Sequence, residues 1–501
     1  MIDYEKAEAL IGTEKYPEAI ALLAAEPVSI LDDGNFERME RCLSSLPEQV
    51  LQQSPEGCFL ALSADLRLGR ANSARQWFNQ LAVLRDQCPE GSPARAAVVR
   101  YVCLAGIMLP QTDNAQILLL LSILHNETIS HRLPPVHLSA TGRRPSVLRG
   151  AKDLSDWGRN YRAVANIVTP LEDSVLPDGG AGAVSAAVAE LLYERGSLDA
   201  ASIEVAGALS SPNVEIAFAG YAQLARIARL DGVSNGRPEE VLQKLGVLLE
   251  ERGAAHLLPN YRALCIRFDI HRGQLDAVEE WAAASQVDAL KDCCLSNAYE
   301  LMSRAKALIA LGRCREAVTL LESLMLVFRS DIRPLDTIEC LVDSAIACEL
   351  LGSRNLALDK LEEALLLAAP FRYVRVIADG GQVAARLLGQ LVKENRRTGS
   401  LPASYLQSVL ETAKNYALLF PLLYDQDRAA PKASAGYMPD VTPTELQVLQ
   451  MLAAGKSNNQ IREQLGVKLQ TVKFHVSNLL EKLGAKNRIE AVNIAKELKI
   501  L

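Results

Sequence analysis

The hydrophobic positions of the chain form helical runs separated by short polar turns that contain glycine. This turn motif is clearest in Arg195-Gly196-Ser197-Leu198-Asp199-Ala200 and recurs as Arg272-Gly273-Gln274-Leu275-Asp276-Ala277. One apolar run ends before each glycine and another begins near the alanine. Glycine suits this place because a helix stop often needs a left-handed backbone, which glycine adopts without steric cost. The pattern predicts a series of helical hairpins.

The turn glycines form two series, and within each the glycines recur at intervals of 35 to 40 residues. The first series is Gly34, Gly69 and Gly106, and the second is Gly196, Gly236, Gly273, Gly312 and Gly352. Such a period is one helix–turn–helix unit per repeat, as in tetratricopeptide-like solenoids. Stacked hairpins bury a continuous core and leave a concave groove. We therefore expect residues 1–428 to be an all-α helical-repeat domain that serves as a sensor or interaction surface.

Composition agrees with stacked helices and excludes other classes. Hydrophobic residues make up 49% of the chain but aromatic residues only 5%, so the core is built from Leu, Ala, Val and Ile. No apolar run reaches the length of a membrane-spanning helix. Residues 1–5 show neither a basic nor an apolar stretch typical of a signal peptide. The ten cysteines show no metal-ligand spacing. We expect a cytoplasmic protein without metal, cofactor or membrane contact.

One stretch, residues 130–157, interrupts the repeats. It contains prolines and a cluster of basic residues, in which Arg143, Arg144 and Arg149 lie close together. A loop of this length inside a compact array is often functional. One interpretation is a contact to an anionic effector, because arginine pairs well with carboxylate or phosphate. The other is an ordered connector whose arginines are solvated or salt-bridged.

A second interruption, residues 429–440, is rich in Ala, Pro, Ser and Gly and is typical of an interdomain linker. The charge changes across it. Residues 441–501 hold nine Lys or Arg against five Asp or Glu, a net charge of +4, although the whole chain carries −7. A small basic domain behind an acidic body indicates double-stranded DNA as a partner.

Caps predict four short helices in residues 441–501. Thr442-Pro443-Thr444-Glu445 and Ser457-Asn458-Asn459-Gln460 are capping boxes, and Asn487 begins the last helix. The second and third helices form a helix–turn–helix unit. The third helix is expected at about residues 469–483. One of its faces is apolar and is expected to join the core. Its residues are Val472, Val476, Leu479, Leu480 and Leu483.

Another face of the third helix carries side chains that suit a major groove. Lysine can donate to guanine, glutamine can pair with adenine and phenylalanine can touch a thymine methyl. The predicted base-reading residues are Gln470, Lys473, Phe474 and Ser477. Bordering residues are placed to contact phosphates and set the docking angle. These predicted phosphate contacts are Asn458, Lys468, Thr471, His475 and Lys482.

The order of these motifs resembles the LuxR-type helix–turn–helix domain. The resemblance rests on Thr471-Val472-Lys473-Phe474-His475 followed by Lys482-Leu483-Gly484 and Asn487-Arg488-Ile489-Glu490-Ala491. It implies a transcription regulator whose third helix reads DNA and whose last helix pairs two protomers as a homodimer on DNA. Lys468 and Arg462 depart from the family pattern, where a capping Ser and a small Ala are usual.

The body resembles the C-terminal part of MalT-like regulators, most clearly in residues 369–381. The ATPase domain with which those proteins start is not expected here, because the Gly-Lys-Ser at 455–457 lies in the DNA-binding turn and lacks the P-loop spacing. The resemblance favours an activator.

Enzymatic activity is not expected. The motifs HExxH, GxSxG and GxGxxG are absent, and the histidines have no matching nucleophile arrangement in sequence. The first hypothesis is a sequence-specific regulator whose repeats sense an effector or partner protein. The alternative is a helical-repeat interaction scaffold with a vestigial DNA-binding module.

Overall fold

The computed structural model describes residues 2–28, 31, 33–131, 139–172, 180–231, 237–284, 295, 297–330, 332–394, 401–424, 443–465, 472, 476, 479–480, 485 and 487–497. The chain divides into two compact units, residues 1–429 and residues 430–501. The predicted linker at 429–440 lies outside the described residues. Among the described helices none is both long and apolar enough to cross a membrane.

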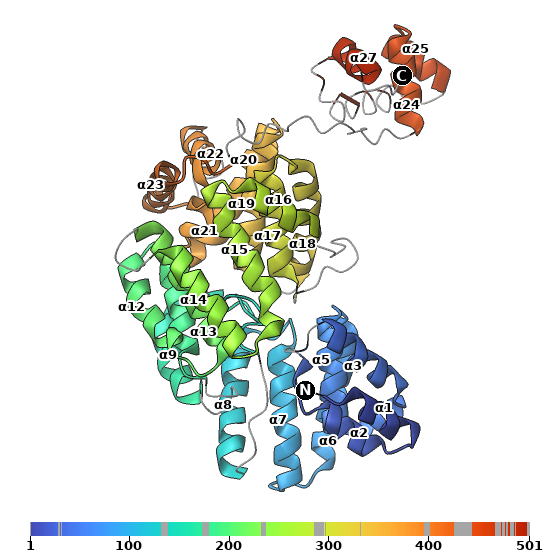
Figure 1. Cartoon of the computed structure of the whole chain (residues 1–501), viewed down its shortest axis with the longest axis vertical. Coiled ribbons are helices and arrows are strands. Elements are labelled where there is room, and N and C mark those ends of the chain that lie inside the picture. The colour runs from blue at the N-terminus through green and yellow to red at the C-terminus, as the bar shows by residue number, and fades with distance from the viewer. Residues whose placement is uncertain are drawn as a thin grey trace. The chain divides into compact units, whose positions relative to one another are not determined.

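The first unit begins with helices that pack around three small cores. Figure 1 draws these helices in blue to cyan. These helices are α1 (Tyr4–Gly12), α2 (Tyr16–Leu23), α3 (Asp33–Ser45), α4 (Glu48–Gln53), α5 (Pro55–Arg67), α6 (Ala71–Gln87), α7 (Pro93–Met108) and α8 (Asn114–His131). Residues 139–154 are non-helical and lead to the 3₁₀ helix η2 (Ser155–Asn160), then to α9 (Tyr161–Val168) and η3 (Thr169–Leu171).

The array of hairpins follows from residue 183 onward. Its helices are α11 (Ala183–Glu194), α12 (Leu198–Leu209), α13 (Val214–Asp231), α14 (Pro238–Glu251), η4 (Ala255–Leu257), α15 (Leu258–Arg272), α16 (Leu275–Ala284), α17 (Ala298–Ala310), α18 (Cys314–Ser330), α19 (Pro334–Leu350), α20 (Arg354–Ala368), η5 (Ala369–Phe371), α21 (Arg375–Ala378), α22 (Gly381–Glu394) and α23 (Ala403–Leu419). Successive helices pack against each other along the array, as the order of colours in Figure 1 shows.

The predicted all-α architecture is confirmed. The described residues contain no strand, and one isolated bridge joins Arg149 and Asp153. The largest core among the described residues runs through α17 to α23 and consists mostly of Leu, Ala and Ile. Helix α19 is the most enclosed element of this core, since Leu335 to Cys348 are all buried. The sequence of α19 does not alternate between an apolar and a polar face, because neighbouring elements surround this helix on every side.

Most of the predicted turn glycines have the expected backbone. Gly69, Gly196, Gly273, Gly312 and Gly352 all have positive φ between 69° and 81°. Each follows directly on a helix or its last turn, so the left-handed residue ends one helix of a hairpin. Gly236 lies outside the described residues.

Two predicted turn glycines are wrong. Gly34 lies in the first turn of α3, and Gly106 lies inside α7. At Gly106 an added Cβ would stand 2.9 Å from Leu120 Cδ1, so this glycine allows α7 and α8 to approach closely. Spacing alone does not distinguish a glycine that ends a helix from one that allows two helices to meet.

The second unit contains α24 (Pro443–Ala453), α25 (Asn458–Leu465) and α27 (Arg488–Glu497). Its separate core includes Val448, Leu449, Ile461 and Ala491. Gly455, with φ of 76°, ends the first of these helices as predicted.

Two glycines of the repeat array allow a matched test of the hairpin turns. Gly352 has φ of 80° and open space around it, whereas Gly389 lies inside α22 with similar open space. We expect Gly352→Ala to lower the free energy of unfolding by about 1 kcal/mol, because alanine is strained at positive φ. Gly389→Ala is expected to raise it by about 0.5–1 kcal/mol. Urea denaturation followed by circular dichroism measures both, and equal effects would contradict the assigned turn.

Candidate functional site

The second unit is held together by apolar contacts among all its helices. Val472 and Leu479, from the predicted third helix, are buried against residues of α24, α25 and α27. Val476 and Leu480 pack at the edge of the same core. The predicted apolar face is therefore confirmed at these four positions, and Leu483 lies outside the described residues.

Polar caps fix the helix beginnings of this unit. Ser457 Oγ accepts from the backbone N–H of Gln460 at 3.4 Å, and Gln460 Oε1 accepts from the N–H of Ser457 at 2.8 Å. This reciprocal pair is the predicted capping box. Asn487 Oδ1 accepts from the N–H of Glu490 at 3.0 Å and caps α27. Arg488 Nη2 donates to the carbonyl of Lys456 at 2.6 Å and joins α27 to the turn before α25.

Most predicted DNA contacts lie outside the described residues. This applies to the base-reading residues Gln470, Lys473, Phe474 and Ser477 and to the phosphate contacts Lys468, Thr471, His475 and Lys482. Asn458 is described and is the first residue of α25, where it is half-buried. The N-terminus of α25 offers backbone N–H groups of the kind that bind phosphate. Arg462 is half-buried on the same helix.

The first unit contains a polar site that involves all three predicted arginines. Residues 139–155, here called the arginine segment, are non-helical up to the start of η2 and are mostly buried. Arg144 is 2% exposed, and its Nη1 lies 2.6 Å from Asp336 Oδ2 on α19. Arg149 pairs with Glu339, one turn further along α19. These are ion pairs between residues almost 200 positions apart in the chain.

Further cations surround the same carboxylates. Arg333 Nε lies 2.6 Å from Asp336 Oδ2, and Arg267 Nη1 lies 2.7 Å from Glu339 Oε1. Lys306 Nζ is 3.2 Å from Glu339 Oε1 and 2.8 Å from Asp343 Oδ1. Asp336, Glu339 and Asp343 follow one another at helical spacing along α19. We call them the acidic row.

The arginine segment also contacts other helices of the array. Ser146 Oγ and the Val147 N–H donate to Glu190 on α11, the latter at 2.8 Å. Ser139 Oγ donates to Glu215 on α13 at 2.6 Å. Asn260 on α15 donates to the carbonyl of Arg143 at 2.8 Å, and Arg143 Nε donates to the carbonyl of His256 at 3.0 Å.

These contacts distinguish the two interpretations of the arginine segment, a contact to an anionic effector and a salt-bridged connector. The guanidinium groups of Arg144 and Arg149 already face carboxylates inside the chain, and Arg143 is 7% exposed. An anionic effector would have to displace Asp336 or Glu339 to reach Arg144 or Arg149. The geometry therefore favours the salt-bridged connector at these two positions.

The pKa values follow from burial and charge. Burial lowers the pKa of Arg144 to about 10, although Asp336 opposes this shift. Burial acts to raise the pKa of Asp336, but the charges of Arg144, Arg333 and Arg149 outweigh it and hold that pKa below its ordinary value. Glu190 behaves differently. Burial raises its pKa to about 7, and the hydrogen bonds from Ser146 and Val147 offset only part of that rise.

The sequence analysis missed the acidic row and Glu190. A signal was present, because three acids stand at helical spacing in an otherwise apolar stretch of α19. Acidic residues are almost never fully buried unless they are paired. Such a row therefore indicates cations brought from elsewhere in the chain, although it does not identify them.

His271 and His256 have partners within the first unit. His271 is buried, with Nδ1 2.6 Å from the carbonyl of Arg267 and Nε2 2.7 Å from Tyr416 Oη. Burial lowers the pKa of His271 well below its ordinary value. His256 Nε2 lies 3.8 Å from Glu215 Oε1.

The fold and these sites together define the class of protein. It consists of a helical-repeat body and a small helix–turn–helix unit in one chain. Residues 440–495 match the family model described as "Bacterial regulatory proteins, luxR family". Residues 161–394 match the model described as "MalT-like TPR region". The chain thus combines a LuxR-type helix–turn–helix domain with a MalT-like helical-repeat region, as the sequence analysis predicted.

Similar proteins agree with this combination. The HTH-type transcriptional regulator MalT of Vibrio campbellii is 28% identical over 294 residues, which cover 56% of this chain and 31% of the relative. The chain therefore matches about a third of that relative's length. The transcriptional regulatory protein DesR of Bacillus subtilis is 44% identical over 57 residues, 11% of this chain and 29% of the relative. MalT of Yersinia pestis is 45% identical over 58 residues, 12% of this chain and 6% of the relative.

Removing one cation from the arginine segment tests its buried pairs. We expect Arg144→Met to lower the free energy of unfolding by about 3 kcal/mol, because Asp336 stays buried with part of its compensation lost. Arg313→Met is the matched control, since the Arg313–Glu316 pair is exposed on both sides and is expected to contribute less than about 1 kcal/mol. Chemical denaturation of both variants gives the comparison. Equal losses would contradict the network.

The pKa of Glu190 predicts a pH dependence. Its folded value of about 7 lies above its ordinary value of 4.5, so the folded state binds more protons than the unfolded state between these values. The contribution of Glu190 to the free energy of unfolding is present at low pH and is lost as pH rises through about 7. We expect Glu190→Gln, which cannot ionise, to flatten the fall in Tm between about pH 5 and about pH 8. Parallel Tm profiles of the two proteins would exclude this role.

Proposed function

We propose that the chain is a sequence-specific transcription regulator that binds double-stranded DNA through residues 441–501. The observation that carries the proposal is the core of the second unit, formed by its described residues, together with the capping box at Ser457 and the match to the luxR family model. A degenerate module would lose caps or core residues. The relatives' names support the regulatory role, and the net charge of +4 in residues 441–501 supports a nucleic-acid partner.

In this proposal the third helix enters the major groove. Gln470, Lys473, Phe474 and Ser477 contact base edges and specify the site. The remaining contacts fix the position of the unit on the phosphate backbone, and they are Asn458, Lys468, Thr471, His475 and Lys482. The N-terminus of α25 adds backbone donors and a favourable dipole beside Asn458.

Two further parts belong to the proposal. The last helix, α27, pairs two protomers as a homodimer on DNA, and residues 429–440 act as the linker between domains 1–428 and 441–501. Val492 and Ile494 of α27 are only partly buried by their own unit, which leaves apolar surface for a partner helix. Pairing raises the effective concentration of the second half-site, so two weak modules bind one two-fold site strongly.

The repeat domain is proposed to sense an effector or a partner protein and to control how the DNA-binding units are presented. The resemblance to MalT-like regulators supports activation over repression. The single continuous set of buried contacts from the arginine segment to α11, α13, α15 and α19 supports the sensing role, because a ligand that moves this segment would act on several repeats together.

A recognition-helix variant tests DNA binding directly. We expect Lys473→Ala to cost about 1–3 kcal/mol of binding free energy and to relax specificity at one base position. The measurement is selection of genomic fragments by the full chain at two salt concentrations, followed by titration of an enriched fragment.

Lys393→Ala is the matched control, because Lys393 is an exposed lysine at the end of α22 in the other unit. It is expected to leave both affinity and selectivity unchanged. Weak, uniform binding that disappears with salt would mean that only phosphate contacts operate. That outcome would contradict sequence-specific regulation and favour the interaction scaffold.

A further inference from the structure

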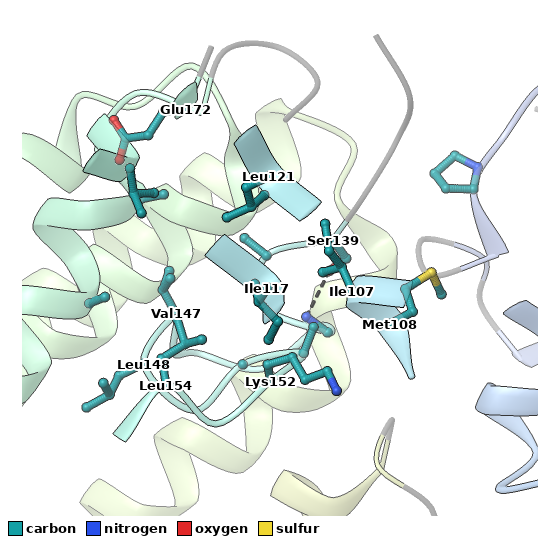
Figure 2. A pocket seen from close by; sticks show the side chains of 18 of the residues that line it. Ile107, Met108, Ile117, Leu121, Ser139, Val147, Leu148, Lys152, Leu154 and Glu172 are labelled. Carbon is teal, nitrogen blue, oxygen red and sulfur yellow. Dashed lines mark hydrogen bonds between the residues drawn. The ribbon is translucent and has the colours of Figure 1, made fainter. Parts of the chain in front are cut away.

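A cavity of about 460 Å³ lies in the first unit beside the arginine segment (Figure 2). Its walls come from α5, α7 and α8 on one side and from the arginine segment, α9 and α11 on the other. The volume falls within the range of small-molecule sites in proteins. Most of the cavity lies before or at the beginning of the segment that matches the MalT-like repeat model at 161–394.

The lining of the cavity is mainly apolar. Figure 2 shows Ile117 and Leu121 of α8 across from Val147, Leu148 and Leu154 of the arginine segment. The apolar lining of a cavity lacks dispersion contacts that a fitting apolar molecule would supply. Because apolar side chains make up most of the wall, the chemistry fits a ligand with an acyl chain or an aromatic body.

The described charged residues of the wall are four cations and three carboxylates, namely Arg67, Arg100, Arg143, Lys152, Glu26, Glu56 and Glu172. In Figure 2 Glu172 lies far from Lys152 across the cavity. Lys152 is half-buried and donates from Nζ to the carbonyl of Leu109. Arg100 is 5% exposed, and burial lowers the pKa of its guanidinium. A carboxylate brought by a ligand can accept a charge-assisted hydrogen bond from the Lys152 ammonium.

We propose that this cavity binds an amphipathic carboxylate, a molecule with an apolar acyl or aromatic body and one anionic head that lies toward Lys152. The proposal deepens the sensing role proposed above, because it names the chemical class of the effector. Val147, Leu148 and Lys152 touch the ligand, while Arg144 and Arg149 of the same segment are paired with the acidic row. Ligand binding therefore acts on the segment that connects the repeats.

Helix α9 offers a cavity-filling variant with a matched control. Tyr161, Val164, Ala165 and Val168 line the cavity at helical spacing, whereas Ala163 is on another face of α9 and does not line it. Ala165→Phe places a ring in the cavity, and Ala163→Phe adds the same ring elsewhere on the helix. Circular dichroism and Tm show that each variant is folded.

The experiment is isothermal titration calorimetry of the full chain with octanoate, decanoate and dodecanoate below their micelle concentrations, and with 1-decanol. We expect one carboxylate bound per chain. We also expect Ala165→Phe to weaken binding at least about tenfold and Ala163→Phe to leave it unchanged. Lys152→Met is expected to weaken decanoate about tenfold and 1-decanol hardly at all, because only the carboxylate loses a charged partner.

Other outcomes would overturn the proposal. If none of the three carboxylates binds, or if Ala165→Phe binds like the wild type, the cavity is not the site. If decanoate and 1-decanol lose affinity equally in Lys152→Met, the anionic head does not lie at Lys152. These titrations contain no DNA, so their failure is separate from a failure of the Lys473→Ala test.

Discussion

The repeat body depends on the charges buried between the arginine segment and α19. Asp336 and Glu339 lie in the most enclosed helix of the array, where an unpaired carboxylate would be strongly unfavourable. Arg144 and Arg149 come from a stretch that would otherwise have to hold buried guanidinium groups without partners. Burying the carboxylates alone or the guanidinium groups alone would be unfavourable, whereas the paired charges compensate each other. The remainder of the body is arranged around this pairing.

One consequence concerns the independence of the repeats. In an ideal solenoid each hairpin contacts only its neighbours, and stability is a sum along the array. Here one non-helical segment bonds to Glu190, Glu215, Asn260 and Asp336, which belong to four different hairpins. A change in this segment reaches all four at the same time, so the array responds more as a unit than a chain of nearest neighbours does.

Local features of this fold were predictable from sequence, and distant partnerships were not. The positive φ of Gly196 and Gly273 and the capping box at Ser457 follow from chemistry within a few residues, which a sequence displays directly. Gly106 was misread because its role depends on Leu120 of the next helix. The ion pair between Arg144 and Asp336 spans 192 positions, and the cavity is bounded by helices that precede the arginine segment and by helices that follow it. Pattern and composition state which residue types need partners, but only the folded chain selects the partners.

The distribution of charge gives a physical reason for joining a DNA-binding unit to an acidic repeat body. The second unit is basic while the whole chain carries −7, so the repeat body is strongly acidic. An acidic body is repelled by the phosphate backbone, and this repulsion opposes non-specific attachment of the whole molecule. In the proposed regulator, affinity then comes from the few contacts of a small domain. The proposed pairing of two such domains would make occupancy sensitive to how they are held. A ligand that shifts the arginine segment by a modest free energy would therefore change occupancy substantially, because simultaneous engagement of two half-sites depends steeply on their presentation.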